Sequence, residues 1–301
     1  MSDAGVTPAV AALPRGLGSA QVARARLLRT LSRTPVVLIG VVLVGAVVVV
    51  ALTAPVLAPY NPVAQIAKPL LPPGGQYLLG TDEFGRDELS RLIWGARVSL
   101  YVGGLAVLIA LSLGATAGVL AGFFGGWMDD VTMRIMDVVL SLPALVLAIA
   151  ITSVLGPTLT NAMLAIGLVY APTFARVARG PTLTVVQVPY IEAARSIGAS
   201  NWRIIARHVL PNVAAPILVQ TTVSFSTAIL TEAALSFLGL GTQPPTASWG
   251  LMLSAARQYM LIDPWIAVLP GCAIAVTVLG FNLLGDGLRD LLDPQMRPLE
   301  S

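Results

Sequence analysis

The chain has 301 residues, of which 56% are hydrophobic and only 11% are charged. Soluble domains carry about 25% charged residues, so this composition excludes an ordinary soluble protein and indicates an integral membrane protein. The net charge of +3 comes from arginines dispersed beside apolar runs, a pattern typical of membrane topology rather than of nucleic-acid binding.

The N-terminal region precedes the first apolar run. Residues 1–18, rich in Ala and Pro, are predicted to form a disordered cytoplasmic tail. Residues 19–34 place leucines and a valine among four arginines, which predicts an amphipathic helix lying in the membrane interface. A cleaved signal peptide is the alternative, but both the leader and the apolar run that follows are too long for one.

Apolar stretches long enough to cross a bilayer recur along the chain. The stretch 138–175 is long enough for two spans, and Leu155-Gly156-Pro157 supplies a turn that would split it. The sequence therefore predicts an all-α integral membrane protein with six transmembrane helices. These are expected near 35–57, 97–122, 136–155, 160–178, 212–238 and 264–285.

The basic residues predict the orientation. Thirteen of the 18 fall on the side of the termini and of residues 180–211, and five fall on the other side. Because cytoplasmic loops carry the excess of Lys and Arg, both termini and the 180–211 loop are predicted to be cytoplasmic. Residues 58–96 then form an extracytoplasmic segment, residues 97–295 form a core with five spans, and residues 296–301 form a short tail.

The segment 79–97 holds two acid–base pairs at i,i+4 spacing, Asp82 with Arg86 and Asp87 with Arg91. Such pairs stabilise an exposed helix by a few tenths of a kcal/mol each, so a short exposed helix is predicted here. In the second span, Gly114, Gly118 and Gly122 recur every four residues. This spacing predicts one helix face that a neighbouring helix approaches closely.

Residues 180–211 are polar and lie between two apolar runs. An arginine at the bilayer centre costs roughly 2.5–3.5 kcal/mol, so Arg195, Arg203 and Arg207 place this stretch in water or against a partner. An ordinary solvated loop is the simplest interpretation. The alternative is a projecting pair of short helices whose apolar side chains enter a partner's cleft.

The local pattern favours the helical pair. Pro181 and Pro189 predict the end of the preceding helix. Tyr190–Ser196 and Asn201–Val209 then predict two short helices joined at Gly198, the second ending before Pro211. Glu192 and Arg195 are expected to be exposed, while Ala193, Ala194 and Ile197 are expected to insert into an apolar cleft.

Glu232 is the one acid well inside an apolar stretch, and an acid within the membrane is a functional hypothesis by default. It lies about 30 Å along the helix from the cytoplasmic end, so a carboxylate at the outer boundary is expected. In the following segment, residues 241–263, Trp249 and Met252 are expected to anchor a loop in the membrane interface or to cap a cavity.

The residue inventory excludes several chemistries. One Cys, Cys272, and one His, His208, cannot build a paired metal site or a disulfide within one chain. Cys272 is expected to be a buried, inert thiol. The single lysine, Lys68, lies in no phosphate-binding glycine loop, so no cofactor is expected on this chain, and ATP with Mg²⁺ would be bound by partner chains.

A resemblance rests on residues 192–211. Glu192-Ala193-Ala194, Gly198, then His208 and Leu210-Pro211 at their spacing resemble the EAA motif of ABC-importer permease subunits. Three further segments, 79–87, 235–241 and 285–294, resemble the dipeptide, oligopeptide and nickel class, in particular its second permease type. The resemblance covers about residues 35–295.

The resemblance implies a type I importer permease fold in the bacterial plasma membrane, with peptide import as the function. It implies a second permease, two ATP-binding subunits and an extracytoplasmic substrate-binding protein as partners. The residues implied to couple to the ATPase are Glu192, Ala193, Ala194, Arg195, Gly198, His208, Leu210 and Pro211. Asp82, Arg86 and Asp87 are expected to help dock the binding protein, and Glu232, Trp249 and Met252 to form an outer gate or anchor.

Other functions stay open at this point. Nickel, glutathione or another small solute could replace peptides as the cargo. An ion-coupled secondary transporter would need several ionisable residues at mid-membrane, and the sequence offers none convincingly. A membrane enzyme would need a nucleophile with its base, and no such pair is evident.

Overall fold

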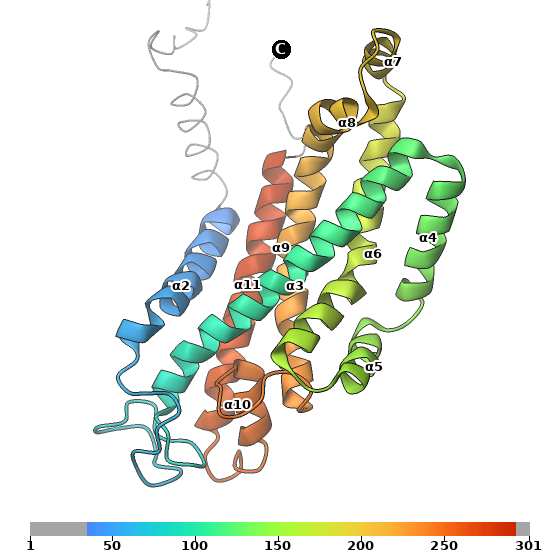
Figure 1. Ribbon diagram of the computed structural model, residues 1–301. Helices are drawn as coiled ribbons and strands as arrows, with labels where there is room; N and C mark the ends of the chain where they lie inside the picture. Colours follow the sequence, from blue (N-terminus) through green and yellow to red (C-terminus); the bar gives the residue numbers. More distant parts are fainter. Residues whose placement is uncertain (1–34, 293–301) are drawn as a thin grey trace, which may run out of the picture.

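The computed structural model describes residues 35–292, so the predictions for residues 1–18, 19–34 and 296–301 lie outside the described part. Helices dominate the described residues (Figure 1). In chain order they are α2 (Pro35–Leu57), α3 (Glu88–Phe124), α4 (Gly126–Leu140), α5 (Ala144–Leu155), α6 (Leu159–Val186), α7 (Pro189–Ser196), α8 (Asn201–Ile204), the π-helical turn η1 (Ile205–Val209), α9 (Leu210–Phe237), α10 (Trp249–Ala256) and α11 (Trp265–Leu292).

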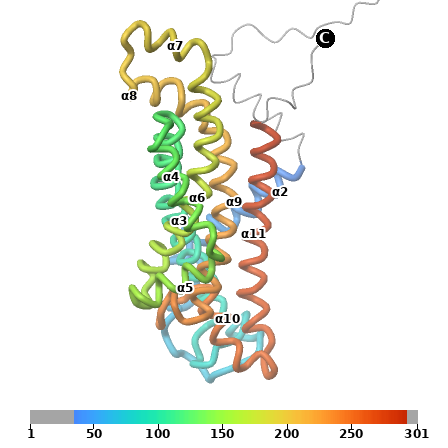
Figure 2. The backbone as a smooth tube through the Cα atoms, turned by 90° about the vertical axis from the view of Figure 1, so that its right-hand side faces the viewer, coloured from blue at the N-terminus to red at the C-terminus, as the bar shows by residue number. Residues whose placement is uncertain are grey.

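Within residues 35–292, five helical segments are long and apolar enough to cross a membrane, and the bent pair α4–α5 makes a sixth crossing if counted as one span. Short helices mark the two ends of the bundle. Figures 1 and 2 show α7 and α8 at one end, with α10 and the 58–87 loop at the opposite end. We call these the coupling end and the outer end.

The third span differs from the prediction of one helix over 136–155. The structure begins α4 ten residues earlier, at Gly126, and breaks the span between Leu140 and Ala144 with an 89° bend. Pro143 explains the break, because a proline has no backbone N–H and disfavours helical geometry at the residue before it. At the other end, Gly125 and Gly126 take φ values of 64° and 58°, which turns the chain sharply out of α3.

The predicted turn after Leu155 is present. Gly156 has a φ of 97°, and the Thr158 hydroxyl oxygen accepts a hydrogen bond from the Asn161 N–H at 3.2 Å. The Asn161 side-chain amide donates in turn to the Leu155 carbonyl at 2.7 Å. These contacts cap the end of α5 and the start of α6, so two helices form where hydropathy alone shows one long stretch.

Three further predictions are wrong: the start of α3, the end of α6 and the burial of Cys272. α3 begins at Glu88, not near 97, because the Asp87 side chain caps it by accepting from the Ser90 N–H. α6 continues past Pro181 to Val186, because Thr182 packs against α3 beside Gly122 and holds the last turns in place. Cys272 is exposed rather than buried, because α11 turns only part of its surface toward the protein.

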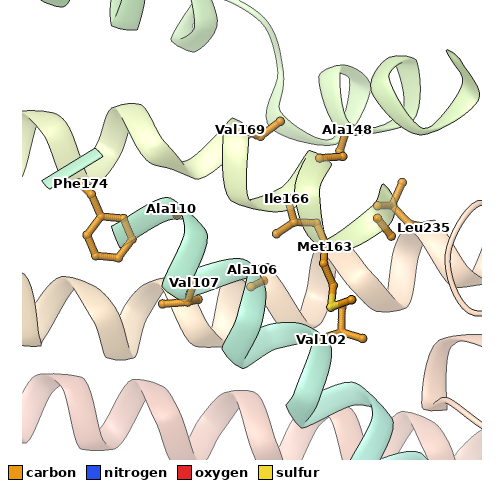
Figure 3. Close-up of a cluster of buried hydrophobic side chains, with 13 residues drawn as sticks. Val102, Ala106, Val107, Ala110, Ala148, Met163, Ile166, Val169, Phe174 and Leu235 are labelled. Carbon is orange, nitrogen blue, oxygen red and sulfur yellow. The ribbon is translucent and has the colours of Figure 1, made fainter. Parts of the chain in front are cut away.

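The core of the bundle is the contact between α3 and α6. A Cβ atom added at Gly114 would lie 2.0 Å from the Ala171 carbonyl oxygen, and one added at Gly118 would lie 2.1 Å from that of Ala175. The predicted close approach on this face is therefore confirmed. Closer to the outer end than these glycines, Ile166 of α6 packs with Val102, Ala106 and other small residues of α3 (Figure 3).

The first and last described helices also lie side by side. Val37 of α2 fills the space beside Gly287 of α11, and Gly40 lies against the backbone of Leu284. The start of α2 therefore packs on the end of α11, so the described chain begins and ends on the same side of the bundle. An even number of crossings requires this arrangement.

Gly118→Val tests the α3–α6 contact. The added side chain would collide with backbone atoms of Ala175, which cannot rotate away, so we expect a loss of about 3 kcal/mol of stability or more. Unfolding of the purified protein in detergent measures it. Gly45→Val is the matched control, because nothing lies within 4 Å of a Cβ atom there; equal unfolding midpoints for the two variants would contradict the packing.

Candidate functional site

The loop at the coupling end begins with α7. Val188 is extended, and Pro189 occupies the first turn, where its missing N–H costs nothing. Glu192 lies in the first turn and Arg195 in the last, so both charges oppose the helix dipole favourably. Gly198 then reverses the chain with a φ of 81°, a conformation that favours glycine.

The underside of this loop is fixed to the bundle. Ile191, Ile204 and Val209 are fully buried in one apolar cluster with Phe123 at the end of α3. The Arg195 guanidinium lies over the Phe123 ring, 5.5 Å from its centroid, at a range where cation–π attraction contributes. The loop is therefore a packed extension of the spans rather than a solvated excursion.

The opposite face of the loop is exposed and partly apolar. Glu192, Ala193 and Arg195 are exposed, and the Ile197 side chain is 86% exposed. Ala194 was expected to insert into a partner's cleft, but it packs on the loop's own apolar cluster instead. Trp202 is 66% exposed and was missed by the sequence reasoning; its position two residues before Ile204, on the opposite side of a helix, is the signal that could have found it.

The sequence predicted that the second short helix ends before Pro211, but the structure continues it. α8, η1 and α9 form one continuous helical segment of 37 residues from Asn201 to Phe237. Pro211 is tolerated in the first turn of α9, and the Asn212 side-chain amide donates to the His208 carbonyl at 2.6 Å. The loop is thus joined to a membrane span without a break.

His208 and two ion pairs connect elements near the coupling end. The half-buried His208 ring lies 5.6 Å from the ring of Tyr190, which joins the two halves of the loop. Arg179 donates two hydrogen bonds to Asp129, both 2.5 Å long. Arg176 donates to Asp137 at 2.6 Å. Both ion pairs tie α6 to α4, and sequence spacing gave no signal for them.

At the outer end, the short exposed helix predicted within residues 79–97 is not found: residues 79–87 form a largely buried loop, and residues 88–97 are the start of α3. The Asp82 carboxylate contacts two arginines, Arg86 of the loop at 2.5 Å and Arg91 of α3 at 3.1 Å. Asp87 accepts from the Ser90 hydroxyl at 2.6 Å and is no partner of Arg91. Asp82, Arg86 and Asp87 are at most 7% exposed, because burial of the ion pairs in the loop outweighs the helical spacing.

Glu232 lies in the last turns of α9, at the outer end, and is fully buried, so it is not a carboxylate exposed in the membrane interface. The hydroxyl of Ser236 donates to it at 2.7 Å, that of Ser99 at 3.2 Å and that of Thr242 at 3.3 Å. Ser99 belongs to α3, Ser236 to α9 and Thr242 to the following loop. Hydroxyl donors replace water around this carboxylate, and they join three segments at the outer end.

Trp249 and Met252 are also buried, 2% and 4% exposed, so neither is the predicted anchor in the membrane interface. The Trp249 indole N–H donates to the Leu92 carbonyl at 3.0 Å, and its ring packs on Gly95. A buried indole needs such a partner. The tryptophan therefore attaches α10 to α3 instead of facing headgroups.

Comparison with known proteins decides the family. Residues 114–298 match the binding-protein-dependent transport system inner membrane component, and residues 24–73 match the N-terminal transmembrane domain of oligopeptide transport permease C. The chain belongs to this family of inner-membrane permeases. It is a multi-pass transport component rather than an enzyme, and membership implies ATPase and binding-protein partners.

Curated relatives of this permease cover most of its length. It is 44% identical over 274 residues to the dipeptide transport system permease protein DppC of Alkalihalophilus pseudofirmus, covering 89% of each chain. It is 48% identical over 265 residues to the di/tripeptide transport system permease protein DppC of Pseudomonas aeruginosa, covering 86% of this chain and 88% of that protein. The glutathione transport system permease protein GsiD of Pectobacterium atrosepticum is 47% identical over 225 residues, 75% of each chain.

A solved structure supports the fold of the permease. A chain of the inward-facing MetNI methionine ABC transporter superposes with a TM-score of 0.54 at 18% sequence identity. It covers 67% of this permease and 96% of the solved chain. The common part has the fold of an ABC transporter permease, as the sequence predicted.

Glu232→Ala tests the hydroxyl cage. It leaves three buried hydroxyl groups without their acceptor and opens a cavity, so we expect the free energy of unfolding to fall by about 2–4 kcal/mol. Glu232→Gln keeps the shape and one acceptor oxygen and should retain most of the stability. Unfolding in detergent compares the three proteins, and an alanine variant as stable as the parent would contradict the assigned contacts.

Glu83 gives a pH-dependent prediction. Burial raises the pKa of the Glu83 carboxyl above its ordinary value of 4.5, and the neighbouring Asp82 charge adds to the rise. The folded state then binds the proton more tightly than the unfolded state, so stability is lost as pH rises above 4.5. We therefore expect Glu83→Gln to have a higher unfolding midpoint than the parent, and we expect this difference to grow from pH 4.5 to neutral pH. The exposed Asp130→Asn is the control, and an advantage that stays constant would oppose the argument.

Proposed function

We propose that this permease is one of two membrane subunits of an ATP-driven importer, and that it forms the translocation path with the second permease. Two ATP-binding subunits complete the complex on the cytoplasmic side. The observation that carries the proposal is the unbroken helical segment Asn201–Phe237. It joins the exposed loop at the coupling end to the buried contacts at the outer end.

The exposed face of the loop is the ATPase-docking surface in this proposal. Glu192 and Arg195 supply charged contacts, and Ile197 and Trp202 supply apolar side chains for a cleft in the ATPase. Gly198 sets the angle between α7 and α8. Because the underside of the loop is packed on Phe123 and α9, a displacement of α7 or α8 reaches the spans directly.

The binding of ATP shifts the transporter only through a difference in affinity between two states. The loop therefore stays docked in both states while its position changes with the ATPase. Leu210 and Pro211 begin α9 and His208 precedes it, so these residues transmit the motion rather than contact the ATPase cleft. ATP and Mg²⁺ belong to the partner chains.

Peptides are the proposed cargo. The named functions of the dipeptide and di/tripeptide relatives, and the extent of the match to them, support this choice. The glutathione permease relative keeps glutathione, itself a small peptide, as the alternative; the nickel alternative has no such support among these relatives. The binding protein selects the cargo before it reaches the permease.

The outer end supplies the docking surface for the binding protein in this proposal. Asp82, Arg86 and Asp87 are buried, so they act by shaping the 79–87 loop rather than by touching the partner. The proposed outer gate also depends on buried residues that act by holding other segments in place, namely Glu232, Trp249 and Met252. They hold the 238–248 loop and α10 against α3.

Gly198→Val tests the coupling role in proteoliposomes that contain the full complex and the binding protein. The parent complex should take up a labelled dipeptide only when ATP is present. The variant forces a β-branched residue to a φ of 81°, which costs about 1–2 kcal/mol or more and changes the angle between the docking helices. We expect ATP hydrolysis to continue while uptake falls at least about tenfold.

Gly180→Val is the matched control, because it has the same side-chain change in α6, with nothing within 4 Å. It should retain uptake. Full uptake by the Gly198 variant would contradict the coupling role. Uptake by this chain without the ATPases would contradict the importer assignment as a whole.

A further inference from the structure

The outer end holds a pocket of about 570 Å³ that no part of the proposed function uses. Two segments distant in the sequence form it, residues 70–73 before α3 and residues 262–265 at the start of α11. Both lie at the end of the bundle opposite α7 and α8 (Figure 1). We call it the outer pocket. Its lining residues are Leu70, Pro72, Pro73, Ile262, Asp263, Pro264 and Trp265.

Asp263 is the only acid that lines the outer pocket among the described residues. The residue is 9% exposed, and its Oδ1 atom accepts a hydrogen bond from the Trp265 N–H at 3.1 Å. Its Oδ2 atom is buried and has no hydrogen-bond partner within residues 35–292. A buried oxygen without a partner costs about 1–3 kcal/mol, more when charged. This half-satisfied carboxylate indicates a ligand that donates to it.

The walls of the pocket restrict what this ligand can be. Pro72, Pro73 and Pro264 have no backbone N–H and cannot compete as donors. Leu70 and Ile262 are apolar. A donor with a long apolar stem fits such a lining, because the stem packs on the walls while the cationic end reaches the carboxylate. Lysine and arginine side chains have this chemistry, and an arginine also stacks on an indole such as that of Trp265.

The rim of the pocket indicates a macromolecular partner. Leu261 is 96% exposed, Ile262 74% and Trp265 51%. An apolar rim around an unpaired carboxylate has the composition of a protein-binding site, in which apolar contact surrounds a buried polar pair. None of the ion pairs found among residues 35–292 includes Asp263.

We propose that the outer pocket receives a lysine or arginine side chain of the extracytoplasmic binding protein, with Asp263 as its counter-ion. The inference rests on the proposed function, since it requires a binding protein that docks on this end. It moves the charged docking contact from Asp82 and Asp87, which already have partners within the protein, to Asp263, whose Oδ2 has none among residues 35–292. The amino terminus of a free peptide has a similar charge but no apolar stem, and the test separates the two.

Asp263→Asn is the first variant. It removes the charge and keeps the shape and the contact with the Trp265 N–H. In nanodiscs that contain the full complex, the affinity for the cognate binding protein should fall about tenfold, as expected for one charge-assisted hydrogen bond. The remaining affinity should also depend less on salt concentration. Asp290→Asn, an equal change at the exposed far end of α11, should leave both quantities unchanged.

A second variant does not depend on the folding of the first. A photo-cross-linking residue at the exposed Ile262 should give an adduct with the binding protein, next to a lysine or arginine. An adduct with a labelled dipeptide or with lipid alone would overturn the proposal. Unchanged affinity in Asp263→Asn would do the same, while the parent complex still binds and transports. If the parent complex binds no binding protein at all, the proposed function itself fails.

Discussion

The contact of the α3 backbone with the α6 backbone is the constraint on which both ends of this permease depend. Lipid tails supply no hydrophobic force between helices, so close van der Waals packing has to hold them. Gly114 and Gly118 make that packing possible at the carbonyls of Ala171 and Ala175. Once α3 is fixed, its two ends become platforms. Phe123 receives the coupling loop, and Gly95 and Ser99 receive Trp249 and Glu232.

Polar groups within the spans follow a second rule, since no water is present to satisfy them. Hydroxyls of α9 donate to carbonyls of their own helix, as Thr221 does to Ile217 and Thr231 to Thr227. A few reach neighbouring helices, as the Ser226 hydroxyl does to Asn282 of α11 at 2.7 Å. The carboxylate of Glu232 is enclosed in the same way. Among residues 35–292, the one buried side-chain oxygen without a partner is Oδ2 of Asp263, just before α11.

The number of spans and the outline of the coupling loop could be predicted from the sequence, because hydropathy, glycine spacing and turn residues are local signals. The break at Pro143 was visible as a proline but not as a bend of 89°, since prolines such as Pro181 also sit inside a continuous helix. What decides between the two outcomes is tertiary packing, which no local pattern records.

The candidate site shows the same division. Glu192 and Gly198 were found by their motif; Glu192 is exposed and Gly198 turns the chain as expected, while their role in coupling stays a prediction. Asp82, Trp249 and Glu232 were predicted to lie at surfaces and are buried. Their partners come from residues far away in the sequence, such as Leu92 for Trp249 and Ser99 for Glu232. Charge and aromaticity show that a residue needs a partner, but whether the partner is water, lipid or protein depends on the fold.

Two interruptions of the helical segment Asn201–Phe237 indicate where it would bend. The π-helical turn at Ile205–Val209 and the proline at 216 both interrupt the regular hydrogen bonding of the segment, and both lie at its coupling end. From there to Phe237 the helix contains no further proline. If the docking loop is displaced, we expect the segment to bend at these two positions and the proline-free remainder to move as one piece. That remainder carries Glu232, so movement relative to α3 would strain the hydrogen bond that Ser99 donates to it and would link the coupling end to the outer end.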